Sequence, residues 1–272
     1  MKKIMVAGPW IGEFGYELFR WQGYLRHCAH EFDHIVVAGR NWHNFLYQDF
    51  CTDYRVFDTD INPCEGRFNR PKTDLTRLLQ RTFGDLPYMT AVNPLDKITD
   101  DRETWPQEFV PYGHWDPLYQ FHVVIHARDI QIPDEQAMVP DHVRIKMTRN
   151  WDPKKWDELG AWLYDNRLLA CSIGCKEAAA HVPGTADLRG MPLFILGKVL
   201  RGSRMIVGPS SGPIHFATLC ECAQVVWGSP HLEMRYKQLW NPFGTHVSFL
   251  SVDDQWDPPL DRVTGAIQDV LR

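Results

Sequence analysis

The sequence lacks any apolar run near the roughly 20 residues that a membrane-spanning helix needs. It also lacks a secretory signal, because the apolar stretch after its basic start soon reaches Glu13 and Glu17. We therefore expect a cytoplasmic protein. Low-complexity runs are missing as well, and 44% hydrophobic with 23% charged residues is the composition of an ordinary folded protein.

An excess of positive charge is missing too. The chain carries 29 basic and 34 acidic side chains, a net charge of −5, so nucleic-acid binding would need a local basic patch. Seven cysteines without a CxxC pair predict reduced thiols rather than a disulfide framework. Tryptophan, in contrast, is abundant: some of the 11 residues belong in a core, and several can form platforms that stack on a sugar or a base.

Short β-branched segments alternate with longer helical patterns, which is typical of parallel α/β layers. Strands are predicted at residues 4–7, 34–38, 54–57, 121–125, 168–173, 205–207, 225–227 and 247–250. Helices are predicted at residues 18–28, 41–50, 72–83, 192–201, 213–222 and 260–271, and from Pro153, which Asp152 can cap. Prolines recur between residues 86 and 117 without a sustained period, which indicates irregular chain and a linker.

These elements predict an α/β fold of two Rossmann-like parallel-sheet domains facing a cleft, one near residues 1–115 and one near 116–255. Parallel sheets bind ligands beyond the carboxyl ends of their strands. The loops that follow Ala7, Ile125, Ile173 and Val207 are therefore the places where a site is expected.

The segment from Gly208 to His215 connects a predicted strand to a predicted helix and contains no acidic residue. Free amides at a helix start attract anions, Ser210 and Ser211 can add hydroxyl donors, and Gly212 lets a ligand approach the backbone. The segment therefore predicts a phosphate seat, although an ordinary capped turn would have the same composition.

The same segment also matches the G-x-S-x-G nucleophile elbow of serine hydrolases, with Ser210 as the nucleophile. Such an enzyme needs an acid and then a histidine later in the chain. Only Glu233 followed by His246 can serve, and these two residues lie close together in the sequence for that arrangement. A hydrolase stays a minority alternative.

The loop after the first strand has the opposite charge. Glu13 and Glu17 would repel a phosphate, but a carboxylate there can remove a proton from an attacking hydroxyl, an effect typically worth about 10² to 10⁴ in rate. Alternatively, both acids only complement the helix dipole. Glu13, inside the loop, is the better candidate, and Trp10, Phe14 and Tyr16 around it can stack on an acceptor.

Other charged residues are less specific. Arg128 follows a predicted strand and can contact a diphosphate, or can simply pair with Asp129. A basic cluster with two tryptophans, which includes Lys155, can neutralise a nucleotide or form a solvated helix face. The triplet Asp58–Asp60 resembles the metal-binding DxD of some sugar transferases, but such triplets arise easily by chance, and we expect no metal site.

The second half resembles the nucleotide-sugar domain of GT-B glycosyltransferases, particularly the heptosyltransferase-like group (family 9-like). The matching elements occur in order: Ile125–Arg128, Arg149–Trp156 with Leu159, Ser172–Gly174, Asp187–Gly190 and Ser210–His215. The resemblance implies that a donor's phosphates and sugar contact Arg128, Lys155, Gly174, Asp187, Leu188, Arg189, Ser210, Ser211, Gly212, Pro213 and His215.

In the first half the resemblance rests on Gly12 and Glu13, which fall where the family has Gly-Asp with the Asp as its proposed base. Ser210 replaces an acid of the family's pattern, so that acid's sugar contact is not expected here. The resemblance further implies metal-independent catalysis with inversion at the anomeric carbon, no permanently bound cofactor, and a last helix (residues 256–272) that packs back on the N-terminal, acceptor-side domain.

The sequence thus predicts a glycosyltransferase that moves a sugar from a nucleotide-diphosphate sugar to a hydroxyl of a glycan or of a hydroxymethylated DNA base. Two alternatives stay open: the serine hydrolase with Ser210, and a nucleotide-sugar-binding protein without catalysis.

Overall fold

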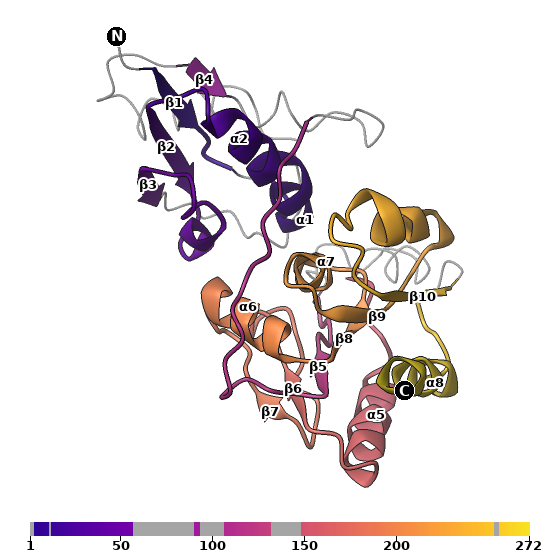
Figure 1. Ribbon diagram of the computed structural model, residues 1–272. Coiled ribbons are helices and arrows are strands. Elements are labelled where there is room, and N and C mark those ends of the chain that lie inside the picture. Colours follow the sequence, from indigo (N-terminus) through magenta and orange to yellow (C-terminus); the bar gives the residue numbers. More distant parts are fainter. Residues whose placement is uncertain (1–2, 11, 57–89, 93–105, 132–147, 253–255) are drawn as a thin grey trace. The chain divides into compact units, whose positions relative to one another are not determined.

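The structure is a computed structural model, and it describes residues 3–10, 12–56, 90–92, 106–131, 148–252 and 256–272. They belong to two compact units, Met1–Val110 and Pro111–Arg272, each built around a parallel sheet (Figure 1). The division lies close to the expected one at residue 115. No helix within the described ranges is long and apolar enough to cross a membrane.

The first unit contains a parallel sheet in the order β3-β2-β1-β4. Its strands are β1 (Ile4–Ala7), β2 (His34–Gly39), β3 (Asp53–Val56) and β4 (Thr90–Val92). A helical stretch follows β1 and consists of α1 (Phe14–Tyr16), a π-helical segment (Glu17–Trp21) and α2 (Gln22–Ala29). A 3₁₀ turn (His43–Leu46) follows β2. Both connections begin at the carboxyl edge of the sheet.

The second unit contains a parallel sheet in the order β10-β9-β8-β5-β6-β7. Its strands are β5 (Val123–Ile125), β6 (Ala170–Ser172), β7 (Ala186–Asp187), β8 (Met205–Pro209), β9 (Ala223–Gly228) and β10 (Val247–Ser251). Its helices are α5 (Pro153–Asp165), α6 (Leu193–Gly202), α7 (Gly212–Leu219) and α8 (Leu260–Leu271).

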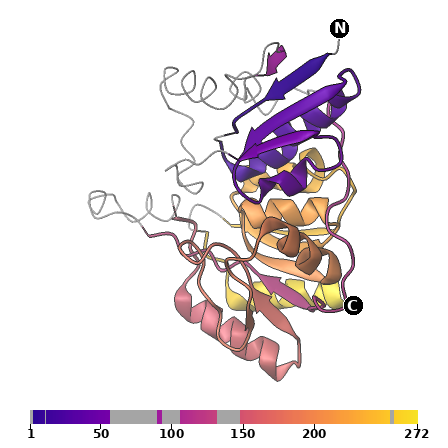
Figure 2. The same cartoon turned by 90° about the vertical axis from the view of Figure 1, so that its left-hand side faces the viewer.

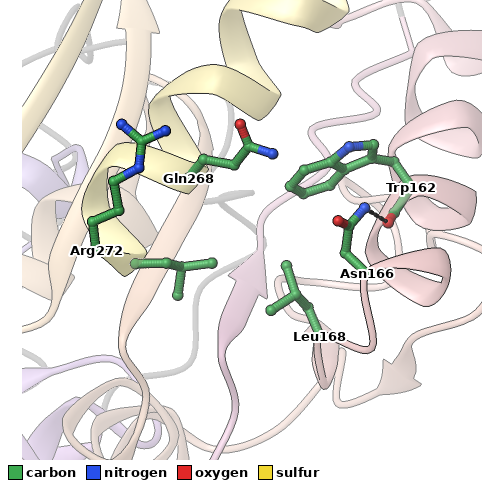
Figure 3. A pocket seen from close by; sticks show the side chains of 6 residues that line it. Trp162, Asn166, Leu168, Gln268 and Arg272 are labelled. Carbon is green, nitrogen blue, oxygen red and sulfur yellow. Dashed lines mark hydrogen bonds between the residues drawn. The ribbon is translucent and has the colours of Figure 1, made fainter.

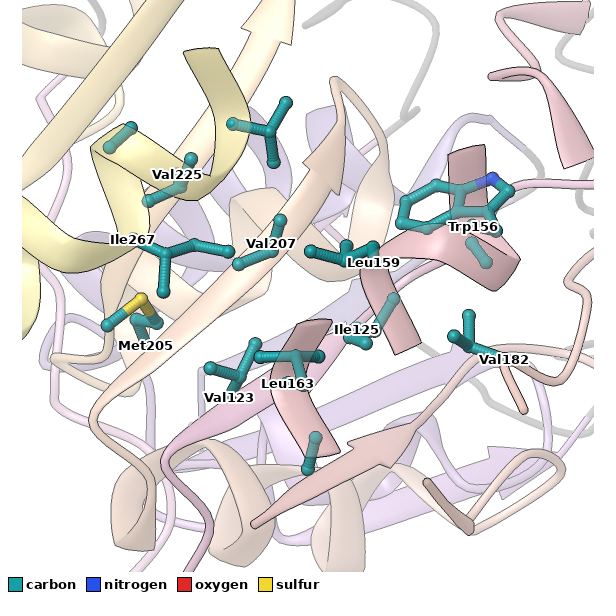
Figure 4. Packing of buried hydrophobic residues seen from close by; sticks show 14 of the residues in the cluster. Val123, Ile125, Trp156, Leu159, Leu163, Val182, Met205, Val207, Val225 and Ile267 are labelled. Carbon is teal, nitrogen blue, oxygen red and sulfur yellow. The ribbon is translucent and has the colours of Figure 1, made fainter. Parts of the chain in front are cut away.

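Helices cover both faces of this second sheet, with α5 and α8 on one face and α6 and α7 on the other (Figures 1 and 2). Alternate strand residues such as Val123, Val207 and Val225 pack against Leu159 of α5 and Ile267 of α8 in one buried cluster (Figure 4). Burial on both faces explains why these strands read as apolar runs rather than as an alternation of apolar and polar residues.

The α/β class and the parallel sheets predicted from the sequence are confirmed. The side chain of Asp152 accepts a hydrogen bond from the Lys154 amide at 2.9 Å, so the predicted start of α5 is also confirmed. Three details differ. The helix expected over 41–50 is only the turn His43–Leu46, β4 lies where irregular chain was expected, and β7 was not predicted. The helix expected at 72–83 lies outside the described residues.

The last helix differs from the expectation in its packing. We expected α8 to return to the first domain, but its buried residues Val263, Ala266 and Ile267 join the core of the second unit, where α8 packs on α5 and β9. The physical reason is that the sheet face beside α5 is apolar and needs cover, and the apolar stripe of α8 supplies it.

Replacing Ile267 by alanine tests this packing. Because Ile267 is fully buried, we expect Ile267→Ala to lower the free energy of unfolding by about 2–5 kcal/mol. Denaturant unfolding measures the change, and Gln268→Ala, at the neighbouring exposed position, is the control with an expected change within about 0.5 kcal/mol. Equal effects of the two variants would contradict the assignment of α8 to this core.

Candidate functional site

The loop between β1 and α1 is held against β2. A Cβ atom on Gly8, whose φ is +102°, would lie 2.4 Å from the Ala38 carbonyl oxygen, so only glycine fits there. After this loop Glu13 is the N-cap residue of α1, and its side chain is exposed. Glu13 therefore lies at the carboxyl edge of the first sheet, where a ligand is expected.

The aromatic residues around Glu13 do not share one environment. Trp10 is 1% exposed and stacks on Trp21 at a centroid distance of 5.6 Å, so it belongs to the core. The expectation that Trp10 stacks on an acceptor is thereby corrected, because no ligand can reach the buried ring. Phe14 and Tyr16 are partly exposed, and their contact with an acceptor stays a prediction.

Glu17 is fully buried, and each of its carboxylate oxygens has a partner. Tyr47 donates its hydroxyl to Oε1 at 2.8 Å, and Nδ1 of His43 lies 2.8 Å from Oε2. Burial alone raises the pKa of the Glu17 carboxyl, but His43, Arg40 and Tyr47 lower it, and the net pKa lies below its ordinary value. Glu17 is thus an anion that orients its neighbours and is not exposed to an acceptor, unlike the free base considered from the sequence.

The loops after β1 and β2 are joined at this edge. Arg40 donates Nη2–H to the carbonyl oxygen of Gly12 at 3.0 Å, and the rings of Phe14 and His43 make an edge contact at 5.3 Å. Sequence reasoning missed both Arg40 and His43. Their position directly after a predicted strand was the available signal, because the carboxyl-end rule applies to every strand of a parallel sheet.

In the second unit, the carboxyl ends of β5, β6 and β8 meet around His126. Its Nδ1 lies 2.9 Å from Oγ of Ser211. A Cβ atom on Gly174 would lie 2.9 Å from Cδ2 of His126, and one on Gly208 would lie 2.7 Å from the His126 carbonyl oxygen. The three loops can pack this closely only because two of them carry glycine.

The start of α7 has free backbone donors. Ser211 is the N-cap residue, yet its side chain makes no capping hydrogen bond because it is bound to His126. Pro213 has no N–H, so the amides of Gly212 and Ile214 are the first donors of the helix, and no acid lies in its first turn. These amides are the donors that the expected phosphate seat would use, and phosphate binding there stays a prediction.

The two serine hydroxyls differ from the expectation. Ser210 and Ser211 are 3% and 5% exposed. Oγ of Ser210 accepts a hydrogen bond from the Tyr236 hydroxyl at 2.8 Å, and Oγ of Ser211 bonds His126. Both hydroxyls have internal partners that fix the loop, and their contact with a donor stays a prediction.

His215 is part of the core. It stacks on Tyr236 at 4.3 Å and makes an edge contact with Trp240 at 4.6 Å. Burial, and then the charges of Arg235 and Arg149, lower the pKa of His215 well below its ordinary value, so the ring is neutral. His215 therefore supports the loop.

The same two arginines are the cations near the start of α7. Arg149 donates an N–H to the carbonyl oxygen of Ser210 at 3.3 Å, and its guanidinium lies 5.0 Å from the ring centroid of Trp256. Arg235 lies 4.6 Å from the ring centroid of Trp240. Sequence reasoning named Arg149 only as part of the matching segment Arg149–Trp156 and missed Arg235, since long-range packing brings both to this loop.

The cations expected to bind the donor have other partners. Arg189 forms a two-pronged ion pair with Asp187 at 2.8 and 2.9 Å and donates to the Ala179 carbonyl oxygen at 2.9 Å. That guanidinium holds the pKa of the Asp187 carboxyl below its usual range. Lys155 pairs with Asp257 at 2.6 Å. Arg128 donates to the Thr148 carbonyl oxygen. The Arg128 and Arg189 contacts tie loops together, and the Lys155 pair ties α5 to the segment before α8.

The Asp187–Gly190 segment lies against the loop after β6. The Leu188 amide donates to the Ser172 carbonyl oxygen at 2.9 Å, and the Gly190 amide donates to the Gly174 carbonyl oxygen at 2.7 Å. These residues lie at the end of β7 and directly after it, beside the loop that follows β6 at the carboxyl edge of the sheet. Their contact with a donor stays a prediction.

The hydroxyl contacts disfavour the hydrolase alternative. Tyr236, not a histidine, occupies the hydrogen-bonding position at Ser210. The serine–histidine pair that does form is Ser211 with His126, and burial with the charge of Arg128 lowers the pKa of His126 to about 3. A histidine that gives up its proton so readily, beside a cation instead of a carboxylate, is a poor general base.

Metal-ligating groups and cavities add no second candidate among the described residues. The described residues contain no cluster of three or more His, Cys, Asp or Glu side chains that could hold a metal ion. The triplet Asp58–Asp60 lies outside the described part. A pocket lies between α5 and α8 (Figure 3), lined by Trp162, Asn166, Leu168, Gln268, Leu271 and Arg272. Leu168 precedes β6, so this pocket lies at the amino edge of the sheet, opposite the candidate site.

Comparisons with known proteins agree with this architecture. No family model and no curated protein matches the chain. Solved structures match along nearly the whole chain. The Escherichia coli ADP-heptose LPS heptosyltransferase II is 13% identical, with a TM-score of 0.60 over 99% of this chain and 98% of that one. E. coli heptosyltransferase WaaC, solved with ADP, is 10% identical, with a TM-score of 0.58 over 98% and 99%.

A glycosyltransferase family 9 protein from Veillonella parvula is 12% identical, with a TM-score of 0.59 over 99% of this chain and 97% of that one. The chain therefore has the fold of heptosyltransferase-like glycosyltransferases, as the resemblance implied. At these identities the similarity establishes the fold and leaves the activity to be argued from the site.

The buried neutral His126 predicts acid sensitivity. Its pKa is about 3 in the folded protein and about 6.5 in an unfolded chain, so between these values the unfolded state binds more protons. The contribution of neutral His126 to the free energy of unfolding is complete above about pH 6.5 and is lost as the pH decreases toward 3. The loss approaches about 1.4 kcal/mol per pH unit for one such group.

Chemical unfolding between pH 7 and pH 4.5 measures this slope. His126→Asn has no titrating ring but can still bond Ser211. We expect it to lower the dependence of the unfolding free energy on pH by an amount that corresponds to about one bound proton. His231→Asn, at an exposed position, is the control and should leave the slope unchanged. A slope that is the same in all three proteins would contradict a buried neutral His126.

Proposed function

We propose that the protein transfers a sugar from a nucleotide-diphosphate sugar to an acceptor hydroxyl. The observation that carries the proposal is the start of α7, where free amides lie near Arg149 and Arg235 without any acid in the first turn. Helix starts and arginines both favour phosphate groups. One structural neighbour was solved with ADP, which supports a nucleotide donor.

The chemistry follows from charge. As the bond between the sugar and the diphosphate breaks, negative charge develops on the departing oxygen. The amides of Gly212 and Ile214 and the two arginines are fixed groups that can stabilise this charge, so we propose that the chain itself supplies the positive charge and that no metal is required. The loops after β5, β6 and β7, with Gly174 and Asp187–Gly190, would border the donor.

We further propose that the first unit binds the acceptor, with the exposed carboxylate of Glu13 accepting the hydroxyl proton. The hydroxyl oxygen then attacks the anomeric carbon on the face opposite the leaving group, which inverts the configuration. Phe14 and Tyr16 would contact the acceptor. A glycan and a hydroxymethylated base both offer the required hydroxyl.

Donor binding is tested by thermal unfolding against a panel of nucleotide-diphosphate sugars. A cognate donor at 100 times its Kd should stabilise the protein by about 2.7 kcal/mol. Arg149→Gln and Arg235→Gln should each weaken binding by about tenfold or more, because each removes a charge-assisted contact. Arg262→Gln, at an exposed position of α8, is the control. If no nucleotide sugar binds, or if the three variants behave alike, the donor site is wrong.

Glu13→Gln tests the base. We expect kcat for transfer to fall by about 10² to 10⁴, because the amide cannot accept the proton, while the donor Kd changes by no more than a few fold. Radiolabelled sugar transfer and calorimetry measure the two quantities. Unchanged transfer would refute the role of Glu13. Donor binding without turnover in either protein would favour a nucleotide-sugar-binding protein.

A further inference from the structure

Glu17 and His43 form a pair of titratable side chains in the described part of the first unit. Glu17 is buried with 1% of its side chain exposed, whereas 16% of the His43 side chain is exposed. The two are joined at 2.8 Å through Nδ1 of His43, and Tyr47 holds the other carboxylate oxygen at 2.8 Å. A buried anion thus fixes a ring that is partly open to solvent.

The pair determines which nitrogen of His43 carries hydrogen. The anionic carboxylate of Glu17 can only accept a hydrogen bond, so Nδ1 must carry the proton. In the neutral ring Nε2 then has a lone pair. Within the described part of this unit, Nε2 has no hydrogen-bond partner. The lone pair on Nε2 can therefore accept a proton while Nδ1 stays bonded to the Glu17 carboxylate.

The surrounding chain places His43 beside the proposed acceptor loop. Its ring contacts that of Phe14, the residue next to Glu13, and the neighbouring Arg40 donates to the Gly12 carbonyl oxygen. Trp42 precedes it with φ of 67°, a left-handed conformation that is rare for an aromatic residue, and is 51% exposed. Such backbone outliers concentrate at functional sites. The loop after β2 thus reaches the same edge as Glu13.

We infer that His43 is a second catalytic residue of the acceptor site, whose Nε2 can take the acceptor's proton in parallel with Glu13. The inference rests on the proposed function. The acceptor O–H proton moves to Nε2, the oxygen forms a bond to the anomeric carbon, and the bond from that carbon to the diphosphate breaks with its electron pair leaving on the diphosphate. The imidazolium later gives the proton to water.

The position of the ring hydrogen is measured first, by NMR of the ¹⁵N-labelled histidines in the wild-type protein, with His43→Asn identifying the His43 signals. We expect hydrogen on Nδ1 in the neutral ring. Hydrogen on Nε2 would overturn the inference, because that nitrogen would then have no lone pair to offer. This readout does not depend on knowing the donor.

Transfer kinetics with the donor found in the panel supply the second test. His43→Asn keeps an N–H for Glu17 but has no second nitrogen, so kcat should fall by about tenfold or more with the donor Kd unchanged. In the Glu13→Gln protein, His43→Asn should lower the remaining kcat by about a further tenfold. Exposed His30→Asn, at the C-cap of α2, is the matched control.

Chemical rescue separates a catalytic from a structural histidine. Added imidazole should restore part of the activity of His43→Ala and none of that of Glu13→Gln. Two outcomes would overturn the role of His43: an activity of His43→Asn within threefold of that of His30→Asn in both backgrounds, or no rescue by imidazole. In either case, donor binding and transfer by the wild-type protein would still support the proposed function. A wild-type protein that binds no nucleotide sugar refutes both.

Discussion

The uncapped start of α7 is the feature on which the proposed chemistry depends. Serine at an N-cap position usually accepts a hydrogen bond from its own helix. Here Ser211 bonds the buried His126 instead, and the proline at the second position has no N–H. The amides of Gly212 and Ile214 therefore stay available at the carboxyl edge of a parallel sheet, where α/β proteins bind their ligands.

The neighbourhood of this helix start explains why so many polar residues are buried. Arg149 and Arg235 raise the local positive charge. Burial lowers the pKa of His126 and of His215, and Arg128 adds to the effect at His126 as Arg235 and Arg149 do at His215, so both rings stay neutral. The protein thus keeps the titrating groups uncharged and leaves the arginines as fixed cations. An anion that enters meets a potential that does not depend on pH near neutrality.

The first unit has the complementary arrangement. Its carboxyl edge carries Glu13, exposed, and Glu17, buried and held as an anion by Tyr47 and His43. One carboxylate can meet a ligand directly, and the other acts through the ring that it orients. The first unit thus presents an exposed carboxylate at the carboxyl edge of its sheet, and the second unit has free amides and arginines at the corresponding edge of its own sheet.

Much of the fold was readable from the sequence. β-branched runs such as Val123–Ile125 alternate with helix starts such as Asp152–Pro153, and both are local signals. β4 and β7 were missed because strands of three and two residues leave too little pattern. The packing of α8 on α5 and β9 was not predicted, because the packing partners of an amphipathic helix are not written in its own residues.

The site was readable only in outline. The loop from Gly208 to His215 and the Glu13 loop were found, because glycine and charge at strand ends are local signals. The partners were not: Ser211 with His126, 85 residues apart, and Glu17 with His43, 26 residues apart, meet only in the folded chain. For the same reason Arg128, Lys155 and Arg189 were expected at a ligand but have internal partners.

The most direct test of the account is an NMR titration of the ¹⁵N-labelled protein with a nucleoside diphosphate, followed at assigned backbone amides. The account predicts that the Gly212 and Ile214 signals shift most strongly, in the direction of stronger hydrogen bonding, with saturation. Binding that leaves these two amides unchanged while signals elsewhere move would contradict it.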